Sequence, residues 1–431
     1  MTGTAAGSIY VSDPVHGFIS VPNKVLFPLL QTPHVQRLRR IRQLGIVPLV
    51  FPGAEHTRFA HAVGAMALMG RALRFLAQAG TPISRTERYA AMAAALLHDV
   101  GHTPLSHALE GRLILKTSHE VISAALIRSL CEKLGPPLDL ALEIFNGSYD
   151  RTFFHELISG QLDTDRLDYL QRDSHFTGVI EGRIGIERIL HTMCVHPVAG
   201  GKGSHIAVRA KGISAVENML IARRLMYWQV YLHKTVIAGD RVLWSVFDRA
   251  RSCLQEGNLC AVEGVVPALR FFLEQSLPES ALNNPEVLDR FLRLDDTDVW
   301  VSLKAWSTST DRILADLAGR FLRRDLFRCT FLDKYPSASI QEEWGARVRD
   351  SLCAKGLSTP HAAAGDVHYY LAVGCAKQAA YTHTCEKIRV VDKQGKLFYL
   401  SKVSDAASLQ TLTEFAGKPY VCYPKDVALP V

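Results

Sequence analysis

One short stretch of the chain holds most of its chemically active side chains. After the apolar run that ends at Leu97, three histidines and one aspartate follow in close succession: His98, Asp99, His102 and His107. Imidazole and carboxylate groups are costly to bury among apolar residues unless a partner binds them. Together they suit a divalent metal, namely Mn, Fe, Co, Ni, Zn or, less well, Mg. The stretch therefore predicts a metal centre, and a chance His-Asp pair in a helix is the competing interpretation.

Two further residues favour the metal centre. His61 lies upstream on a predicted helix, and Asp165 lies downstream in an acidic segment. A histidine, a His-Asp pair and an aspartate follow one another in this order in the HD phosphohydrolase superfamily, which the sequence resembles closely. The resemblance implies that the metal ligands are His61, His98, Asp99 and Asp165.

The segments that must position these residues are predicted to be helices. One helix over 57–78 carries the upstream histidine, and a second over 88–97 delivers the His-Asp pair. Gly101 ends the second helix, and a third is expected to begin with Pro104 in its first turn. Three helices should therefore meet at the metal centre or beside it.

Elsewhere the pattern predicts two hairpins and one long helix. Alternating residues over 9–21 indicate a hairpin with Pro and Gly at its turn. Two strands, over 192–198 and 205–209, flank a Gly-rich break and indicate a second hairpin. A single long helix is expected from Ser214 towards Ala250.

The character of the chain changes near residue 332. Residues 1–332 are predicted to form one mainly helical HD-type domain, and residues 333–431 a smaller α+β region. In that region strands are expected over 367–376, 387–392, 396–400 and 418–422, with a helix over 405–416. The predicted fold class is thus mainly α, with a helical core, small β-hairpins and a C-terminal α+β region.

The composition is that of an ordinary globular protein, with 48% hydrophobic and 21% charged residues. The N-terminus lacks the basic start and apolar centre of a signal peptide. The longest apolar run, over 90–97, is too short to span a bilayer. The nine cysteines include no Cys-x-x-Cys pair and are expected to be reduced thiols. These features predict a cytoplasmic protein without a membrane partner.

Positive charge indicates an anionic ligand. The net charge is +7 and the isoelectric point about 8.9. Arginines cluster over 37–42, 223–224 and 320–324. Guanidinium groups match phosphate oxygens, so a polyphosphate or single-stranded nucleic acid is the functional interpretation and solvated helix faces are the alternative.

Longer motifs narrow the resemblance. They lie, in chain order, over 13–17, 32–39, 43–45, 51–54, 58–61, 96–107, 118–120, 163–173 and 231–234. Their order and content are similar to those of the deoxynucleoside triphosphate (dNTP) triphosphohydrolases, the type represented by the human HD-domain dNTPase and its bacterial relatives. The resemblance covers roughly the first 330 residues. It implies a metal-dependent enzyme that hydrolyses a dNTP to a deoxynucleoside and intact triphosphate.

The resemblance also implies a role for individual residues. For catalysis it implies His107, His102 and His119, the last two near the phosphates and a second metal, with Glu110 and Glu120 orienting such groups. For the triphosphate it implies Arg58, Arg166 and Arg223, and for the deoxyribose Tyr169, Asp173 and Tyr231. For sugar and base it implies Gln43 and Leu44.

A regulatory nucleotide site is implied by Gln36 and Arg39. Gln31 stands where the human enzyme has an aspartate that reads guanine. A neutral amide reads the guanine edge less selectively, so an activator other than GTP, such as a dNTP, is expected. The family's nucleotides lie between subunits, which implies a homo-oligomer: a dimer, tetramer or hexamer.

Two other function classes remain open from the sequence. The chain could be another HD phosphohydrolase or phosphodiesterase that acts on a different phosphate compound. It could instead be a non-catalytic nucleotide sensor or single-stranded nucleic-acid binder. Gln43 and the segment from Tyr169 to Asp173 match the dNTPase motifs, which argues against a different HD phosphohydrolase. The complete set of implied metal ligands, together with His107, argues against a non-catalytic binder. Base preference and the native metal stay undetermined.

Overall fold

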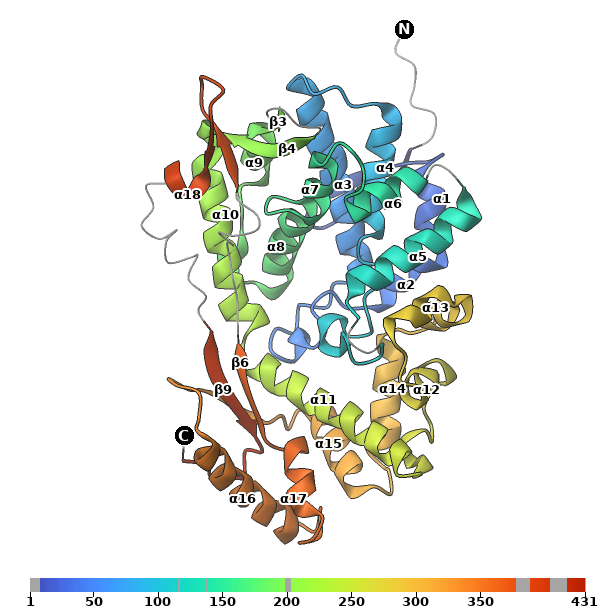
Figure 1. Ribbon diagram of the computed structural model, residues 1–431, viewed down its shortest axis with the longest axis vertical. Helices are drawn as coiled ribbons and strands as arrows, with labels where there is room; N and C mark the ends of the chain where they lie inside the picture. Colours follow the sequence, from blue (N-terminus) through green and yellow to red (C-terminus); the bar gives the residue numbers. More distant parts are fainter. Residues whose placement is uncertain are drawn as a thin grey trace.

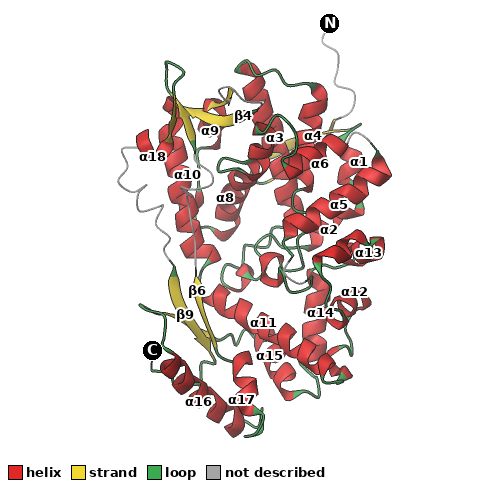
Figure 2. Cartoon of the chain, in the orientation of Figure 1, coloured by secondary structure: helices red, strands yellow, loops and turns green. Residues whose placement is uncertain are grey.

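A computed structural model describes residues 8–114, 117–135, 138–197, 203–376, 388–403 and 417–430. Within these ranges the chain is mainly helical, with three small sheets of two, four and three strands (Figures 1 and 2). The predicted fold class is confirmed. None of the described helices combines the length and the apolar character needed to cross a membrane.

The N-terminal hairpin forms as predicted. Strands β1 (Ser8–Asp13) and β2 (Gly17–Pro22) pair antiparallel, with Asp13 opposite Gly17. An Asp13 carboxylate oxygen accepts the backbone N–H groups of Val15 and His16, at 2.9 and 2.8 Å. Gly17 has φ +70°, a value that glycine adopts without steric cost. The turn therefore closes through local chemistry.

Three helices form the centre of the first half of the molecule: α3 (Arg58–Gln78), α4 (Arg85–Leu97) and α8 (Thr164–Thr177). The side chains of Thr57, Ser84 and Asp163 each accept a backbone N–H in the first turn and so cap the three starts. A Cβ at Gly64 of α3 would collide with the side chains of Asp168 and Arg172 on α8. Glycine at this position lets α3 and α8 approach closely enough for their side chains to meet.

The remaining helices surround this centre and extend the fold downwards in Figure 1. They are α1 (Leu26–Leu30), α2 (Pro33–Arg37), α5 (His119–Leu134), α6 (Asp139–Asn146), α7 (Phe153–Ser159), α9 (Ile186–Thr192), α12 (Pro267–Glu274), α13 (Pro285–Leu292), α14 (Asp296–Trp306), α15 (Arg312–Leu322), α16 (Ala338–Ala354), α17 (Ala363–Asp366) and α18 (Leu400–Val403).

The prediction of a single long helix after Ser214 is wrong. The chain forms α10 (Ile213–Met226), a π-helical turn (Tyr227–Tyr231) and then α11 (Lys234–Gln255). His233 is extended, with ψ 131°, and its ring nitrogen accepts the N–H of Thr235 to cap α11. The two helices consequently run in different directions (Figure 1). A π-turn of this kind often marks a functional site.

The prediction of a helix that begins near Pro104 is also wrong. Only a short 3₁₀ turn (Ser106–Leu109) forms, after Leu105 and Ser106 adopt φ values of +55° and +57°. Such values are unfavourable for residues with a side chain and need tertiary support. The Asp296 carboxylate accepts the N–H of Leu105 at 2.7 Å, and the Ser106 hydroxyl donates to the carbonyl of Arg42 at 2.6 Å. Distant segments thus impose this turn.

Two sheets join the chain before residue 332 to the chain after it. Strand β9 (Lys418–Tyr423) lies between β5 (Arg328–Phe331) and β6 (Ala372–Ala376) and is antiparallel to both. The second sheet has the order β3-β4-β7-β8, made of β3 (Met193–Pro197), β4 (Ser204–Arg209), β7 (Arg389–Val391) and β8 (Leu397–Tyr399).

The predicted strands around these sheets are confirmed with shifted ends. The β3–β4 pairing is antiparallel, as expected for the second hairpin. The strand expected over 367–376 begins only at Ala372, because residues 367–369 form a 3₁₀ turn that continues α17. The helix expected over 405–416, and most of the Gly-rich break, lie outside the described residues. The division into domains at residue 332 stays a prediction.

Candidate active site

The four predicted metal ligands converge where α3, α4 and α8 meet. His61 projects from α3, His98 and Asp99 lie at the end of α4, and Asp165 lies in the first turn of α8. The Nε2 atoms of His61 and His98 are 3.3 Å apart, and an Asp165 oxygen is 3.0 and 3.5 Å from them. An Asp99 oxygen is 3.3 Å from His98 Nε2. Ligands about 2.1 Å from one metal ion have this mutual spacing, so the donor set fits a divalent metal.

The other nitrogen of each candidate ligand imidazole has a hydrogen-bond partner outside the metal position. His61 Nδ1 lies 2.7 Å from an Asp168 oxygen, and His98 Nδ1 lies 2.8 Å from the carbonyl of Ala95. Such partners fix the ring orientation and leave Nε2 directed at the metal position. Asp168 also accepts hydrogen bonds from Arg172, and it lies 2.6 Å from His16 Nε2 in the N-terminal hairpin.

Charges around this centre are strongly coupled. Burial alone would raise the pKa of Asp168, but Arg172 and hydrogen bonds with His16 and His61 hold that pKa well below its usual value. Burial disfavours a charge on His61, yet Asp165 and Asp168 raise its pKa to about 10. The carboxylates thus create a place for positive charge, which a metal ion at this site would satisfy.

A second cluster of imidazoles lies beside the first. Nitrogen atoms of His102, His107 and His119 lie within 4.8 Å of one another. The two oxygens of Glu110 contact His107 Nδ1 at 2.6 Å and His119 Nδ1 at 2.7 Å. Burial opposes ionisation of Glu110, but these hydrogen bonds hold its pKa far below the usual value. An ionised Glu110 therefore orients two histidines, as its predicted role requires.

His102 connects the two clusters. Its Nδ1 lies 3.2 Å from an Asp99 oxygen, and its ring stacks on that of His119 with centroids 3.9 Å apart. Burial, assisted by Arg58, lowers its pKa well below the usual value, so the ring is neutral. The buried Nε2 of His102 finds no hydrogen-bond partner among the described residues. A buried nitrogen without a partner indicates that a ligand completes the site.

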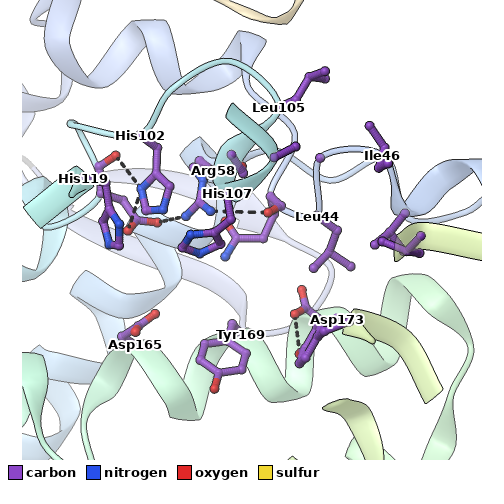
Figure 3. A pocket seen from close by; sticks show the side chains of 18 of the residues that line it. Leu44, Ile46, Arg58, His102, Leu105, His107, His119, Asp165, Tyr169 and Asp173 are labelled. Carbon is purple, nitrogen blue, oxygen red and sulfur yellow. Dashed lines mark hydrogen bonds and ion pairs between the residues drawn. The ribbon is translucent and has the colours of Figure 1, made fainter. Parts of the chain in front are cut away.

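A cavity of about 500 Å³ opens from these clusters (Figure 3). All eight predicted substrate contacts line it: Gln43, Leu44, Arg58, Arg166, Tyr169, Asp173, Arg223 and Tyr231. Asp99, Asp165, His102, His107 and His119 line the same cavity, as does Glu120. His61, His98 and Glu110 are not among the residues that line it. Most of the lining residues were therefore predicted from the sequence, but the cavity that they form together was not.

Its charge changes from one end to the other. Arg58 donates to Asp99 at 2.5 Å and to the Ser106 hydroxyl at 2.7 Å, which places one guanidinium against the metal ligands. The Tyr231 hydroxyl donates to Asp173 at 2.7 Å, one step further along the cavity. In Figure 3, Leu44 lies on the opposite side from His119. The lining therefore offers one end with Arg58, the imidazoles and the carboxylates Asp99 and Asp165, a polar middle and an apolar end.

Three contributors were missed by the sequence analysis. His56 Nε2 lies 2.8 Å from Asp173 and helps hold that carboxylate. His16 and Asp168 were assigned no role from the sequence, but Asp168 contacts the His61 ring and His16 contacts Asp168. The one available signal was the spacing of Asp168, one helical turn from Asp165.

The predicted regulatory residues lie apart from the cavity lining. Arg39 donates to Gln36 at 3.0 Å, and its guanidinium covers the ring of Phe59 at 3.5 Å. Arg37, in the same arginine cluster, is 1% exposed and donates to the carbonyls of Leu294, Val100 and His102. The interpretation of the whole cluster as a phosphate-binding surface is therefore wrong for Arg37, which supports the His102 loop.

Comparison with known proteins agrees with this geometry. An HD-domain model matches residues 58–173, and a model of an HD-associated region matches residues 184–263. The uncharacterized protein YwfO of Bacillus subtilis is 34% identical over 378 residues, 86% of this chain and 80% of that protein. The crystal structure of a phosphohydrolase from Bacteroides thetaiotaomicron superimposes with a TM-score of 0.87 and 37% identity, over 97% of this chain and 100% of that one.

A more distant relative has an assigned activity. The deoxynucleoside triphosphate triphosphohydrolase SAMHD1 of Bos taurus is 30% identical over 281 residues, which are 56% of this chain and 47% of that protein. The matched HD model begins at Arg58 and ends at Asp173, and so contains the four converging ligands. With this ligand set and these similarities, the chain belongs to the HD-domain phosphohydrolase family.

Proposed function

We propose that this protein is a metal-dependent dNTP triphosphohydrolase. One observation carries the proposal: a single cavity joins the candidate metal ligands and Arg58 to the Asp173–Tyr231 pair and to an apolar end. A dNTP presents the same order of groups, from triphosphate through deoxyribose to base. The 30% identity to a dNTP triphosphohydrolase supports the same substrate class.

The triphosphate would lie at the end with Arg58 and the imidazoles. Arg166 and Arg223 also line the cavity and would offset phosphate charge, as guanidinium forks do. A divalent metal held by His61, His98, Asp99 and Asp165 would polarise phosphate oxygens and lower the pKa of a bound water. The neutral His102, with its free Nε2, would contact the same phosphates.

His107 would supply the proton that the leaving 5′-oxygen takes up. Water attacks the α-phosphorus, the bond from phosphorus to the 5′-oxygen breaks, and that oxygen takes up a proton. Glu110 orients the His107 ring through Nδ1, which leaves Nε2 available to supply the proton. The products are a deoxynucleoside and intact triphosphate. Asp173 and Tyr231, already hydrogen-bonded, would hold the 3′-hydroxyl beside the ring of Tyr169.

Regulation by nucleotides is part of the proposal. Gln36 and Arg39 would contact an activator nucleotide, a dNTP rather than GTP, between subunits of a homo-oligomer. Sedimentation and turnover with each nucleotide, for wild type and Arg39→Ala, measure this directly. A mass and rate that ignore every nucleotide in both proteins would refute it.

The decisive test of the activity is product analysis. The purified protein is incubated with each of the four dNTPs, alone and in pairs, in the presence of Mn²⁺ or Mg²⁺. Anion exchange then separates triphosphate from diphosphate and phosphate. Triphosphate and deoxynucleoside in equal amounts are expected. Release of pyrophosphate or phosphate would assign a different HD phosphohydrolase reaction, and binding without turnover would assign a nucleotide sensor.

A further inference from the structure

The apolar end of the cavity contains one carboxylate that the proposed function does not use. This end is formed by Leu44 to Val47 on one side and by Val236 and Asp240 of α11 on the other. Val236 and Asp240 are one helical turn apart, so they share a face of the helix. Figure 3 shows Leu44 and Ile46 far from the imidazoles of His102 and His119. Gly239, the residue before Asp240, packs against Ile46, so Asp240 lines this end of the cavity.

The position of Asp240 follows from close packing of α11. A Cβ at Gly239 would come within 2.7 Å of the Ile46 side chain, so glycine brings the helix directly onto this segment. The next residue, Asp240, is only partly buried, as expected for a group on the wall of a cavity. Burial nevertheless raises the pKa of its carboxyl to about 7, which Arg241 offsets only in part.

Asp240 differs from the other carboxylates of the lining in having no partner. Asp99 is paired with Arg58, Asp165 with His61, and Asp173 with both His56 and Tyr231. No hydrogen bond or ion pair joins the Asp240 side chain to any other residue in the described part of the chain. The neighbouring guanidinium of Arg241 is directed to the Tyr420 hydroxyl instead. A carboxylate in such a place gains most from a donor that arrives with the ligand.

We infer that Asp240 is a specificity-determining residue that accepts hydrogen bonds from the amino group of the substrate base. The inference rests on the proposed dNTP substrate. Guanine presents an N–H and an amino group side by side, which match the two oxygens of a carboxylate. Adenine and cytosine present one amino group each. Thymine presents a single N–H between two carbonyl oxygens, which a carboxylate repels.

The test compares bases that differ by single groups. Values of kcat/KM are measured for the four dNTPs and for deoxyinosine triphosphate, which lacks only the 2-amino group of dGTP. Wild type should prefer dGTP to deoxyinosine triphosphate and to dTTP by about tenfold or more, the discrimination typical of a site that pairs a buried polar group. Asp240→Ala and Asp240→Asn should lose most of that preference, mainly through a higher KM for dGTP.

A matched control lies on the same helix. Asp248→Asn removes a carboxylate that pairs with Arg112 at 2.5 Å and does not line the cavity, so base preference should stay as in wild type. The Asp240 variants should not lower kcat/KM for dTTP, because the carboxylate makes no favourable contact with thymine. A packing role would lower kcat/KM for every base equally.

Failure of the inference is distinguishable from failure of the proposed function. If wild type hydrolyses dGTP, deoxyinosine triphosphate and dTTP equally well, or the Asp240 variants lower all rates together, the inference is wrong and the dNTPase proposal stands. If no dNTP is hydrolysed under any condition, the proposed function is wrong. Should the variants fail to fold by circular dichroism, the wild-type ratio of dGTP to deoxyinosine triphosphate decides alone.

Discussion

His61 and His107 make the same hydrogen bond in opposite surroundings. Each has a carboxylate oxygen at Nδ1, from Asp168 at 2.7 Å and from Glu110 at 2.6 Å. The side chains of His61 and Asp168 are both 0% exposed, whereas those of His107 and Glu110 are 65% and 24% exposed. The same pairing therefore holds a buried ring in one place and an accessible ring in the other.

The difference originates in the elements that carry the two rings. His61 lies in the first turn of α3, which packs against α8 at Gly64, so helix packing determines its position. His107 lies on a 3₁₀ turn whose first residue, Ser106, has a positive φ, as does Leu105 before it. Loops positioned by a rigid scaffold commonly carry catalytic groups. We therefore propose that the buried cluster holds the metal and that the exposed cluster meets the substrate.

The largest effect is expected from removing buried ligands. His98→Ala combined with Asp99→Ala should reduce bound metal from about one ion per chain to near zero and abolish turnover, because half of the predicted donor set is lost. Elemental analysis by mass spectrometry after gel filtration measures this. A double variant that keeps full metal occupancy would show that these residues are not the ligands.

Removing the exposed imidazole should separate catalysis from metal binding. His107→Ala should lower kcat by about 10² or more, the usual contribution of general acid–base catalysis, with metal content unchanged. His361→Ala changes another exposed histidine and serves as the control. Activity of His107→Ala within a few-fold of wild type, or loss of its metal, would remove the proposed distinction between the clusters.

A smaller effect is expected from the carboxylate behind His61. Asp168→Asn should weaken metal affinity by about 10- to 100-fold, since the hydrogen bond that orients His61 becomes weaker. Excess metal should restore most of the turnover, which separates this role from direct catalysis. Titration with Mn²⁺ followed by calorimetry measures the affinity. An unchanged affinity would mean that Asp168 serves only to bind Arg172.

The smallest effect is expected on stability. It comes from His34, a buried imidazole that pairs with no carboxylate in the described part of the chain. Burial lowers the pKa of His34 to about 4, with Lys133 and Arg37 adding to the shift. Between pH 6.5 and pH 4, His34 binds a proton in the unfolded chain but not in the folded chain. The free energy of unfolding therefore falls as the pH falls. From pH 7 to pH 5 the loss should be about 2 kcal/mol.

The pH effect is measured by urea denaturation of wild type and His34→Gln at both pH values. Other groups titrate in this range as well, so the relevant quantity is the difference between the two proteins. Wild type should lose more stability than His34→Gln on going to pH 5. Equal losses would show that His34 titrates normally in the folded state.

Much of the site was evident from residue order. Histidine, then a His-Asp pair, then aspartate predicted a metal centre, and the four side chains do converge between three helices. The helices themselves were predictable because their caps, apolar runs and ends are encoded in neighbouring residues, as at Ser84 and Glu87. The predicted roles of individual residues in catalysis stay predictions until the variants are measured.

The errors share one physical cause. The break at His233 and the turn at Leu105 oppose local preference, since residues 214–250 suit a continuous helix and leucine disfavours positive φ. Contacts with distant residues, such as Asp296 with Leu105, outweigh those preferences. The same holds for Arg37, which a charge pattern assigns to the surface and tertiary contacts place in the interior.

The sequence by itself determined the helical class, the family and the choice of candidate metal ligands, because these depend on short patterns and on donor chemistry. Only the tertiary structure decided which groups share a cavity and which stay without a partner. Asp168 and Asp240 are both acidic residues in helices, and the local sequence offers Asp168 only the i,i+4 partner Arg172. Asp168 also acquires His61 and His16 from two distant segments, and Asp240 faces a cavity without a partner among the described residues. Such differences arise from contacts between segments far apart in the chain, which local sequence does not encode.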